Sequence, residues 1–325
     1  MITIAGEALY DVFPKMGAAE ASQIGLDAVT GGSPFNVACG LGRLGFAPRF
    51  FGGIAEGQMG DRQAEILTAA GVRADAIVRK PNLVPLMLIA LAEDGQPTYS
   101  YYGQSTADVD ITLEDLAVLP QLPSLLHLGS YSLVTPPLAD TLATLVERLP
   151  ADSLLTLDPN VRPMVDPDVE VWRRRLDPLY RRADIIKLSD EDIAFLAPGA
   201  DPEAYARDLS TLTGAPVYLT LGHQGVTVIR GDRRQTIVAP QVEVVDTVGA
   251  GDSFQATLIA WASRPENAKA LRARTAAFEA LVDIAEAAVA VAARICAQRG
   301  PVIPAAGDLE AAISTRLFER FAHNR

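Results

Sequence analysis

Short apolar segments alternate with longer amphipathic stretches along most of the chain, and this alternation limits the fold more than any other feature. The segments 125–128, 154–157, 184–188 and 217–221 have the length and apolar composition of buried strands. Strands separated by helical stretches pair in parallel, because each helix returns the chain to the same edge of the sheet. The sequence therefore predicts a parallel, doubly wound α/β sheet.

The same patterns extend toward both ends of the chain. Further strands are predicted at 2–7 and 50–54, and helices at 60–70 and 285–298. The arginines around 173–182 share helical spacing with apolar residues. They predict the solvated face of an amphipathic helix rather than a nucleic-acid patch.

The composition limits the classes of partner. With 325 residues, 49% of them hydrophobic, the chain can bury the core of one large α/β domain. Its formal net charge of −12 argues against a broad surface for nucleic acid or anionic lipid. No run of 18 uncharged apolar residues occurs, and the first residues lack the basic region of a signal peptide. We therefore expect a cytoplasmic protein that binds neither nucleic acid nor membrane.

Cysteines and histidines are few and scattered. Cys39 and Cys296 lie far apart in apolar helical segments, which favours buried, reduced thiols over a disulfide. His127, His223 and His323 do not have the spacing of zinc ligands. We expect no metal site built from these five residues.

A stretch near residue 250 has the order strand, tight turn, helix, which is typical of an anion-binding loop. It reads Val244-Val245-Asp246-Thr247-Val248-Gly249-Ala250-Gly251-Asp252-Ser253-Phe254. Because the first amides of a helix lack internal partners, Gly249, Ala250 and Gly251 can hold a phosphate on their backbone. Asp252 can accept a proton beside it. This pairing suits phosphoryl transfer to a hydroxyl, and an aspartate that only caps the helix is the alternative.

Two glycines, Gly31 and Gly32, precede a second predicted helix. Ser33 has the position of the N-cap, and Pro34 that of the first helical residue. The glycines let a ligand approach the backbone, and the amide of Asn36 can both donate to and accept from sugar hydroxyls. This turn is a second candidate for ligand binding.

Polar residues follow several of the predicted strands, where ligands gather in open α/β sheets. Asp11 follows the first strand, and it is either a ligand or a turn aspartate. Arg162 can neutralise phosphate or serve a structural role. Ser189 and Asp192 also fit a plain helix capping box. The segment 220–226 fits an ordinary strand-turn-strand.

Two of these segments resemble signatures of one family. Residues 246–254 are similar to D-T-x-G-A-G-D-x-F and residues 31–38 to G-G-x-x-x-N-x-A, which characterise the PfkB carbohydrate kinases, or ribokinase-like sugar kinases. The resemblance covers essentially the whole chain and implies a single domain over 1–325. It implies a three-layer α/β/α ribokinase-like fold with a mainly parallel central sheet and a small β-sheet lid, at roughly 10–30 and 84–104. It also implies an ATP-dependent sugar kinase, most similar to fructokinases.

The resemblance further implies roles for individual residues. Asp252 would be the catalytic base, and the backbone of Gly249, Ala250 and Gly251 would hold the γ-phosphoryl group. Asp192 would organise Mg²⁺ through water, and a monovalent cation such as K⁺ would lie beside Asp246. The expected sugar contacts are Asp11, Gly31, Gly32, Asn36, Tyr101, Asn160 and Arg162. The expected ATP contacts are Lys187, Ser189, Thr220, Gly222 and Gly225, with the helix at 285–298 as a wall of the adenine pocket.

The lid segment leaves the identity of the sugar open. Strands at 86–91 and 98–102 flank Glu93-Asp94-Gly95-Gln96 and predict a hairpin. Many fructokinase-like members carry an arginine shortly after such a strand, whereas this chain has Gly103-Gln104-Ser105-Thr106-Ala107-Asp108. In the family the lid also frequently pairs with a second copy, so a homodimer through the lid is expected.

Two alternatives to a fructokinase stay open. Within the same class, Glu7, Asp11 and Arg162 suit a 2-keto-3-deoxygluconate kinase equally well. From another class, the protein could be a catalytically silent sugar or nucleotide sensor. The presence of Asp252 argues against the sensor.

Overall fold

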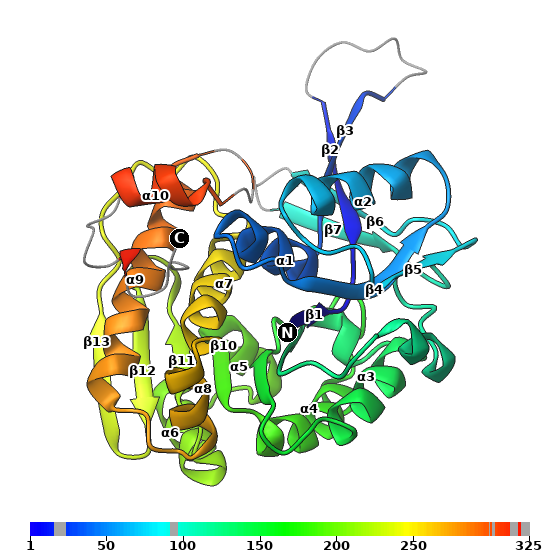
Figure 1. Cartoon of the computed structure of the whole chain (residues 1–325). Coiled ribbons are helices and arrows are strands. Elements are labelled where there is room, and N and C mark those ends of the chain that lie inside the picture. The colour runs from blue at the N-terminus through cyan, green and yellow to red at the C-terminus, as the bar shows by residue number, and fades with distance from the viewer. Residues whose placement is uncertain (16–23, 92–96, 299, 301–302, 313–317, 320–325) are drawn as a thin grey trace.

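The structure, a computed structural model, describes residues 1–15, 24–91, 97–298, 300, 303–312 and 318–319. Within them, one large sheet forms the centre of the molecule (Figure 1). In sheet order its strands are β13 (Arg233–Ile237), β12 (Val226–Arg230), β11 (Val217–Thr220), β10 (Ile185–Ser189), β9 (Leu154–Asp158), β8 (Leu125–Gly129), β1 (Ile2–Ala5), β4 (Arg49–Ala55) and β5 (Ile77–Lys80). The strands from β11 to β5 are parallel, and β12 and β13 add antiparallel pairs at one edge. The predicted mainly parallel sheet is confirmed.

Helices pack on both faces of this sheet and complete the predicted three layers. One buried apolar cluster joins the sheet to α1 (Ser33–Arg43), α2 (Gln58–Ala69), α7 (Ala250–Ala262), α8 (Pro265–Arg272), α9 (Phe278–Cys296) and α10 (Ala306–Ala312). A second cluster joins it to α3 (Leu138–Glu147), α4 (Val169–Arg182), α5 (Asp190–Leu196) and α6 (Pro202–Thr213). Short 3-10 turns are η1 (Leu113–Val118), η2 (Ser130–Leu133) and η3 (Gly222–Gln224).

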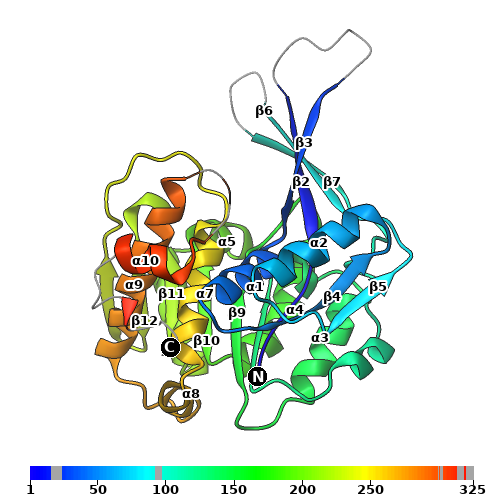
Figure 2. The ribbon, with the colours of Figure 1, turned by 45° about the horizontal axis from the view of Figure 1, so that its top comes forward.

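A smaller sheet projects from this body and corresponds to the predicted lid (Figures 1 and 2). Its strand order is β3 (Leu26–Gly31), β2 (Leu9–Pro14), β6 (Leu86–Leu91) and β7 (Pro97–Tyr102). The predicted hairpin between β6 and β7 is confirmed, and its turn at 93–96 lies outside the described residues.

Strand register brings four residues of the lid into one row. Asp11 pairs with Val29 on one side and with Met87 on the other, and Met87 pairs with Tyr101. Residues paired directly across neighbouring strands share a face of the sheet. The predicted sugar contacts Asp11 and Tyr101 therefore lie on the same face of the lid, separated by Met87.

Two local predictions are wrong. Val244 and Val245 do not form a strand: their side chains are 60% and 58% exposed in a loop. The backbone here bonds to the end of α9 instead: the amides of Val245 and Asp246 donate to Cys296 O at 2.8 and 3.2 Å. Ser33 is not the N-cap of α1, because Gly32 takes that position with a φ of 105°.

Other differences concern bounds and burial. The helix α2 begins at Gln58, after a glycine with positive φ, and α9 begins at Phe278, seven residues before the predicted start. The arginine-rich helix α4 buries its apolar stripe and is confirmed as amphipathic. Cys39 and Cys296 are free thiols, as predicted, but only half-buried. No helix in the described part of the chain has the length and apolar character needed to cross a bilayer.

Candidate active site

The N-terminus of α7 forms an open turn. Gly249 caps the helix in the left-handed conformation, with a φ of 79°. The amide of Ala250 donates to Thr247 O over 3.3 Å, so this expected phosphate donor is engaged within the turn. The next two amides, of Gly251 and Asp252, have no acceptor among the described residues. They lie at the positive end of the helix dipole and are free to hold an anion.

Asp252 lies in the first turn of α7 and is held by two side chains of α1. Its Oδ1 accepts a hydrogen bond from Ser33 Oγ at 2.6 Å, and its Oδ2 accepts one from Asn36 Nδ2 at 2.8 Å. Burial raises the pKa of this carboxyl above its ordinary value, against the two donors and the charges of Lys187 and Arg162. A fixed carboxylate of raised basicity is suited to take a proton from an alcohol.

Sequence reasoning missed the part that Ser33 plays here. The N-cap prediction directed its hydroxyl toward the amides of its own helix. Because Gly32 is the N-cap, Ser33 lies inside the first turn, and its hydroxyl donates to α7 instead. The two partners are 219 residues apart in the chain, so no local pattern reveals the contact.

Asp11, on β2, lies beside the glycine turn that precedes α1. A Cβ on Gly31 would lie 2.4 Å from Asp11 Oδ2, so any other residue there would displace this carboxylate. Burial raises the pKa of Asp11 to about 6; the charge of Arg162 lowers it, and that of Asp252 raises it. Asp11 therefore belongs to the same electrostatic centre as Asp252.

Arg162 provides the positive charge of this centre. Its Nη1 donates to the backbone oxygens of Asn160 and of the next residue, at 3.2 and 3.1 Å. Asn160 turns the chain sharply after β9, with a φ of 40°. The guanidinium lowers the pKa values of Glu7, Asp11 and Asp252, so it lies within electrostatic range of three carboxyl groups.

Two buried acids lie beneath these residues. Glu7 follows β1, is 1% exposed, and neither of its carboxyl oxygens has a hydrogen-bond partner among the described residues. Burial raises its pKa to about 8, so it is protonated at neutral pH. Asp108 accepts hydrogen bonds from Thr106 Oγ1 at 2.6 Å and from Tyr131 OH at 2.7 Å. The floor of the site is therefore polar but largely shielded from water.

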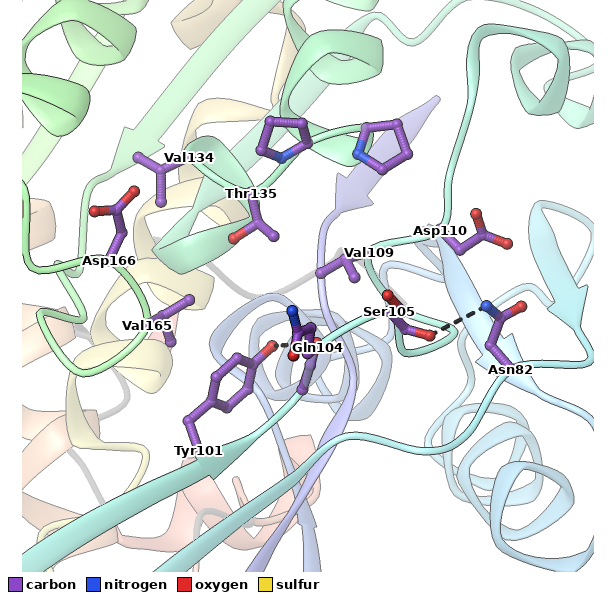
Figure 3. Close-up of a pocket in the computed structure, with 13 residues that line it drawn as sticks. Asn82, Tyr101, Gln104, Ser105, Val109, Asp110, Val134, Thr135, Val165 and Asp166 are labelled. Carbon is purple, nitrogen blue, oxygen red and sulfur yellow. Dashed lines mark hydrogen bonds between the residues drawn. The ribbon is translucent and has the colours of Figure 1, made fainter.

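Tyr101 lies apart from the other expected sugar contacts. It packs on Tyr131, with ring centroids 5.2 Å apart, and its hydroxyl donates to Gly103 O at 3.4 Å. It lines a cavity of about 530 Å³, which neither Asp252 nor Arg162 lines. Figure 3 shows Tyr101, Val165 and Asp166 along one side of this cavity and Asn82 and Asp110 along the other.

Lys187, in the middle of β10, forms a buried ion pair with Asp158, the last residue of β9. Its Nζ lies 2.7 Å from Asp158 Oδ2. Burial raises the pKa of Asp158 to about 6, although Lys187 lowers it. Burial lowers the pKa of Lys187, but the carboxylates of Asp158, Asp192 and Asp252 outweigh it and leave the pKa raised. The pair is therefore ionised at neutral pH.

Ser189 and Asp192 form the capping box of α5. Asp192 Oδ2 accepts from the amide of Ser189 at 2.8 Å, and its Oδ1 accepts from the amide of Val161 at 2.7 Å. Both oxygens are thus engaged by the backbone, and the side chain is buried. This arrangement suits a role through water rather than direct ligation of a metal.

The expected ATP residues after β11 differ in their surroundings. The hydroxyl of Thr220 donates to Leu188 O at 3.3 Å. A Cβ on Gly222 would meet nothing within 4 Å, which leaves open space for a ligand. A Cβ on Gly225 would lie 2.0 Å from Ile237 O, so this glycine is required by the packing of β12 on β13.

The side chain of Asp246 ties the loop before α7 to the segment that follows α9. Its Oδ1 accepts from the amide of Val248 and its Oδ2 from that of Gly300, both at 3.0 Å. Within the described residues, no group of three His, Cys, Asp or Glu side chains is arranged to hold a metal ion. A cation at this site would therefore depend on backbone, water or ligand oxygens.

Comparisons with known proteins show what this chain is similar to. Residues 2–306 match the pfkB family carbohydrate kinase pattern. The chain is 36% identical over 262 residues to a fructokinase of Rhizobium leguminosarum bv. trifolii, which covers 80% of this chain and 79% of the relative. It is 30% identical over 259 residues to fructokinase-2 of Oryza sativa subsp. japonica, covering 78% and 77%.

Solved structures share the fold over nearly the whole chain. The fructokinase of Xylella fastidiosa with bound ATP superposes with a TM-score of 0.83 at 25% identity, covering 97% of this chain and 98% of that one. The fructokinase of Vibrio cholerae O395 in its fructose, ADP and calcium ion bound form gives 0.77 at 22% identity, covering 96% and 98%. The predicted ribokinase-like fold with its lid is confirmed.

Proposed function

The chain belongs to the pfkB family of carbohydrate kinases and is an ATP-dependent sugar kinase of the fructokinase type, and we propose that fructose is its acceptor and Asp252 its catalytic base. One observation carries the assignment of the base. Asp252 is fixed by Ser33 and Asn36 at the N-terminus of α7, directly beside two amides that are free to bind an anion.

The proposed reaction follows from this arrangement. A sugar hydroxyl that approaches Asp252 gives its proton to the carboxylate as its oxygen attacks the γ-phosphorus of ATP in line. The bond from this phosphorus to the β-phosphate oxygen breaks, and ADP leaves. The amides of Gly251 and Asp252, presented by the turn at Gly249 and Ala250, donate to the oxygens of the moving phosphoryl group. Because the charge develops next to donors already in place, little reorganisation is needed.

The surrounding residues fit a nucleotide and its metal. The open space at Gly222, the hydroxyl of Thr220 and the segment Lys187–Ser189 would hold ATP, whereas Gly225 serves the packing of the strands. Mg²⁺ fits if it is held by phosphate oxygens and water, with Asp192 in the second layer, since the described residues offer no carboxylate cluster. When bound, Mg²⁺ neutralises charge on the phosphate oxygens. We also propose that K⁺ lies beside Asp246, where backbone, water or ligand oxygens would hold it.

The sugar would lie between the lid and α1. Asp11, Asn36 and Arg162 lie around Asp252, and Gly31 and Gly32 leave room for the Asp11 carboxylate and the backbone of Glu7. We place the far end of the sugar toward Tyr101 and Asn160. The cavity that Tyr101 lines contains the carboxylates Asp110 and Asp166, and no cationic side chain lines it. This lining favours an uncharged ketose over 2-keto-3-deoxygluconate, because no cationic side chain there would pair with a carboxylate.

A kinase assay with a panel of acceptors tests the proposal. Purified protein is incubated with ATP, Mg²⁺ and fructose, 2-keto-3-deoxygluconate, ribose or a nucleoside, and ADP release is measured. We expect the highest kcat/KM with fructose. Activity confined to 2-keto-3-deoxygluconate would make that sugar acid the acceptor in place of fructose. Activity confined to ribose or nucleosides would overturn both of these assignments. A protein that binds ATP and sugar but transfers no phosphate to any acceptor would be a sensor.

We further propose that the lid pairs with the lid of a second copy. Apolar side chains are exposed on both faces of the lid, with Leu26 at 50% and Tyr102 at 60% on one face and Tyr99 at 46% on the other. Exposed apolar side chains of this size are available for contact with a second copy. Light scattering after size exclusion should give the mass of a dimer, and Tyr102→Lys should convert it to a monomer. A wild-type monomer at micromolar concentration would refute the pairing.

A further inference from the structure

A buried carboxylate at the amino end of β10 is surrounded by arginines. Asp184 immediately precedes the strand, and its side chain is 0% exposed. Arg272 Nη1 and Arg274 Nη1 donate to its Oδ1 at 2.6 and 3.0 Å, and Arg182 Nη1 donates to its Oδ2 at 3.1 Å. The amide of Leu155 donates to the same Oδ2 at 2.9 Å. Each oxygen accepts two hydrogen bonds, so this carboxylate is saturated.

A fourth arginine lies against these three. We define the arginine cluster as Arg182, Arg230, Arg272 and Arg274. Arg230, the last residue of β12, donates to the backbone oxygens of Arg274 and Ala276. Burial lowers the pKa of Arg274; the charge of Asp184 raises it, and the other three arginines lower it further. The four positive charges therefore act on one another, with one aspartate among them.

Neighbouring acids do not balance this charge. Asp152 lies between two residues whose backbone oxygens accept from the cluster, and Asp232 follows β12 by two residues; both are exposed. In the described part of the chain, neither forms an ion pair with an arginine of the cluster. Four guanidinium groups thus share one carboxylate, in a chain whose formal net charge is −12. A local excess of positive charge attracts small anions.

The cluster also keeps unused donors. Arg182 Nε, Arg272 Nη2 and Arg274 Nε have no acceptor among the described residues. The three side chains are 22%, 28% and 28% exposed, so solvent reaches them. The planar fork of a guanidinium matches the oxygens of a phosphate group. Because Asp184 and backbone oxygens already fix each fork, an arriving anion would immobilise little further side chain.

Helix ends explain only part of the cluster. Arg182 and Arg272 lie in the last turns of α4 and α8, where the helix dipole favours positive charge. Arg274 lies beyond α8 with a φ of 58°, a backbone conformation that favours glycine. Asp184 already has two other arginine partners, so its pairing does not require this strained residue. The charge of Arg274 is therefore available to a further partner.

We propose that the arginine cluster binds the phosphate group of a small anion, at a site separate from the one for ATP and sugar. Arg182, Arg272 and Arg274 supply the donors, and Asp184 fixes their positions. The expected ATP contact Ser189 is at the other end of β10, and five residues of strand span about 16 Å. A phosphate at the cluster therefore does not occupy the anion turn of α7. The ligand is free inorganic phosphate or a phosphate monoester, and the test has an arm for each.

Isothermal titration calorimetry at low ionic strength compares inorganic phosphate with glycerol 3-phosphate. The matched variants are Arg182→Gln and Arg181→Gln, neighbours in the last turn of α4 that each remove one positive charge. Arg181 pairs with Asp177 on its own helix instead. In Arg182→Gln the affinity for the probe should fall about tenfold, the usual worth of one charge-assisted hydrogen bond, and in Arg181→Gln it should change by less than about twofold.

Each outcome of this titration decides something. Binding of both probes would support a site for a phosphate monoester, and binding of inorganic phosphate alone would support a site for the free ion. No saturable binding of either probe to the wild type would overturn the proposal. Equal losses in the two variants would also overturn it, because they would place the anion elsewhere on the protein.

Arg274→Gly separates binding from folding. Glycine adopts the φ of 58° without strain, and Arg182 and Arg272 still pair with Asp184. The thermal midpoint in phosphate-free buffer should therefore stay within about 4 °C of the wild type. The affinity for the probe should again fall about tenfold, since one donor and one charge are lost. A variant that binds phosphate as tightly as the wild type would show that the cluster is purely structural.

Discussion

Replacement of Ser33 by alanine tests how the protein sets the basicity of Asp252. The hydroxyl of Ser33 donates to Asp252 Oδ1 at 2.6 Å in a buried site. A hydrogen bond to a charged group is worth about 1.5–3 kcal/mol, and each pKa unit corresponds to about 1.4 kcal/mol. Since this donor favours the ionised carboxylate, its loss should raise the pKa of Asp252 further, by about one to two units.

The assay is the pH dependence of kcat/KM with the best acceptor. In Ser33→Ala the acid limb, where the base becomes protonated, should move to higher pH by at least about one unit. Ser153→Ala is a matched control, because Ser153 is equally buried but donates to Pro123 O, far from α7. An acid limb that stays in place in Ser33→Ala, or that moves equally in both variants, would refute the reasoning.

Two further predictions concern stability. The pKa of Glu7 in the folded state is about 8, above its ordinary value of 4.5, so folding favours the protonated carboxyl. As pH rises from 4.5 to 8, the unfolded chain ionises Glu7 first, and the folded protein loses stability. Glu7→Gln should therefore raise the melting temperature at pH 9 and lose that advantage below pH 4.5; a lower melting temperature at pH 9 would contradict the assignment. Gly225→Ala, with a φ of 103° and a Cβ 2.0 Å from Ile237 O, should cost at least about 2 kcal/mol of unfolding free energy in urea titrations. Gly222→Ala, at a residue with a φ of 54° and open space around it, should cost only about 1 kcal/mol of unfolding free energy. Equal losses in the two variants would argue against the clash with Ile237 O as the cause.

The parts of this fold that could be predicted are those encoded locally. Alternating apolar segments predict the parallel sheet because each buried strand and each helix face carries its own pattern. The anion turn could also be predicted, since Gly249 supplies the left-handed residue that begins α7. Val244 and Val245 show the limit: their β-branched side chains favour a strand, but the backbone there bonds to the end of α9, where the amide of Val245 donates to Cys296 O.

The parts that could not be predicted depend on contacts between distant segments. Ser33 has the composition of an N-cap, and only the packing of α1 on α7 directs it to Asp252. Asp158 and Lys187 lie on two ordinary strands, and the parallel pairing of β9 with β10 brings them together. Neither contact leaves a periodic signal in the sequence.

The central claim is that Asp252 removes the proton of the acceptor hydroxyl, and Asp252→Asn tests it most directly. The amide oxygen at this position can still accept from Asn36, and the amide nitrogen can donate to Ser33 Oγ, so the geometry should persist. In rapid-quench single turnovers with ATP and the preferred sugar, the rate of phosphoryl transfer should fall by a factor of about 10²–10⁴, with ADP affinity unchanged. A transfer rate equal to that of the wild type would contradict the account.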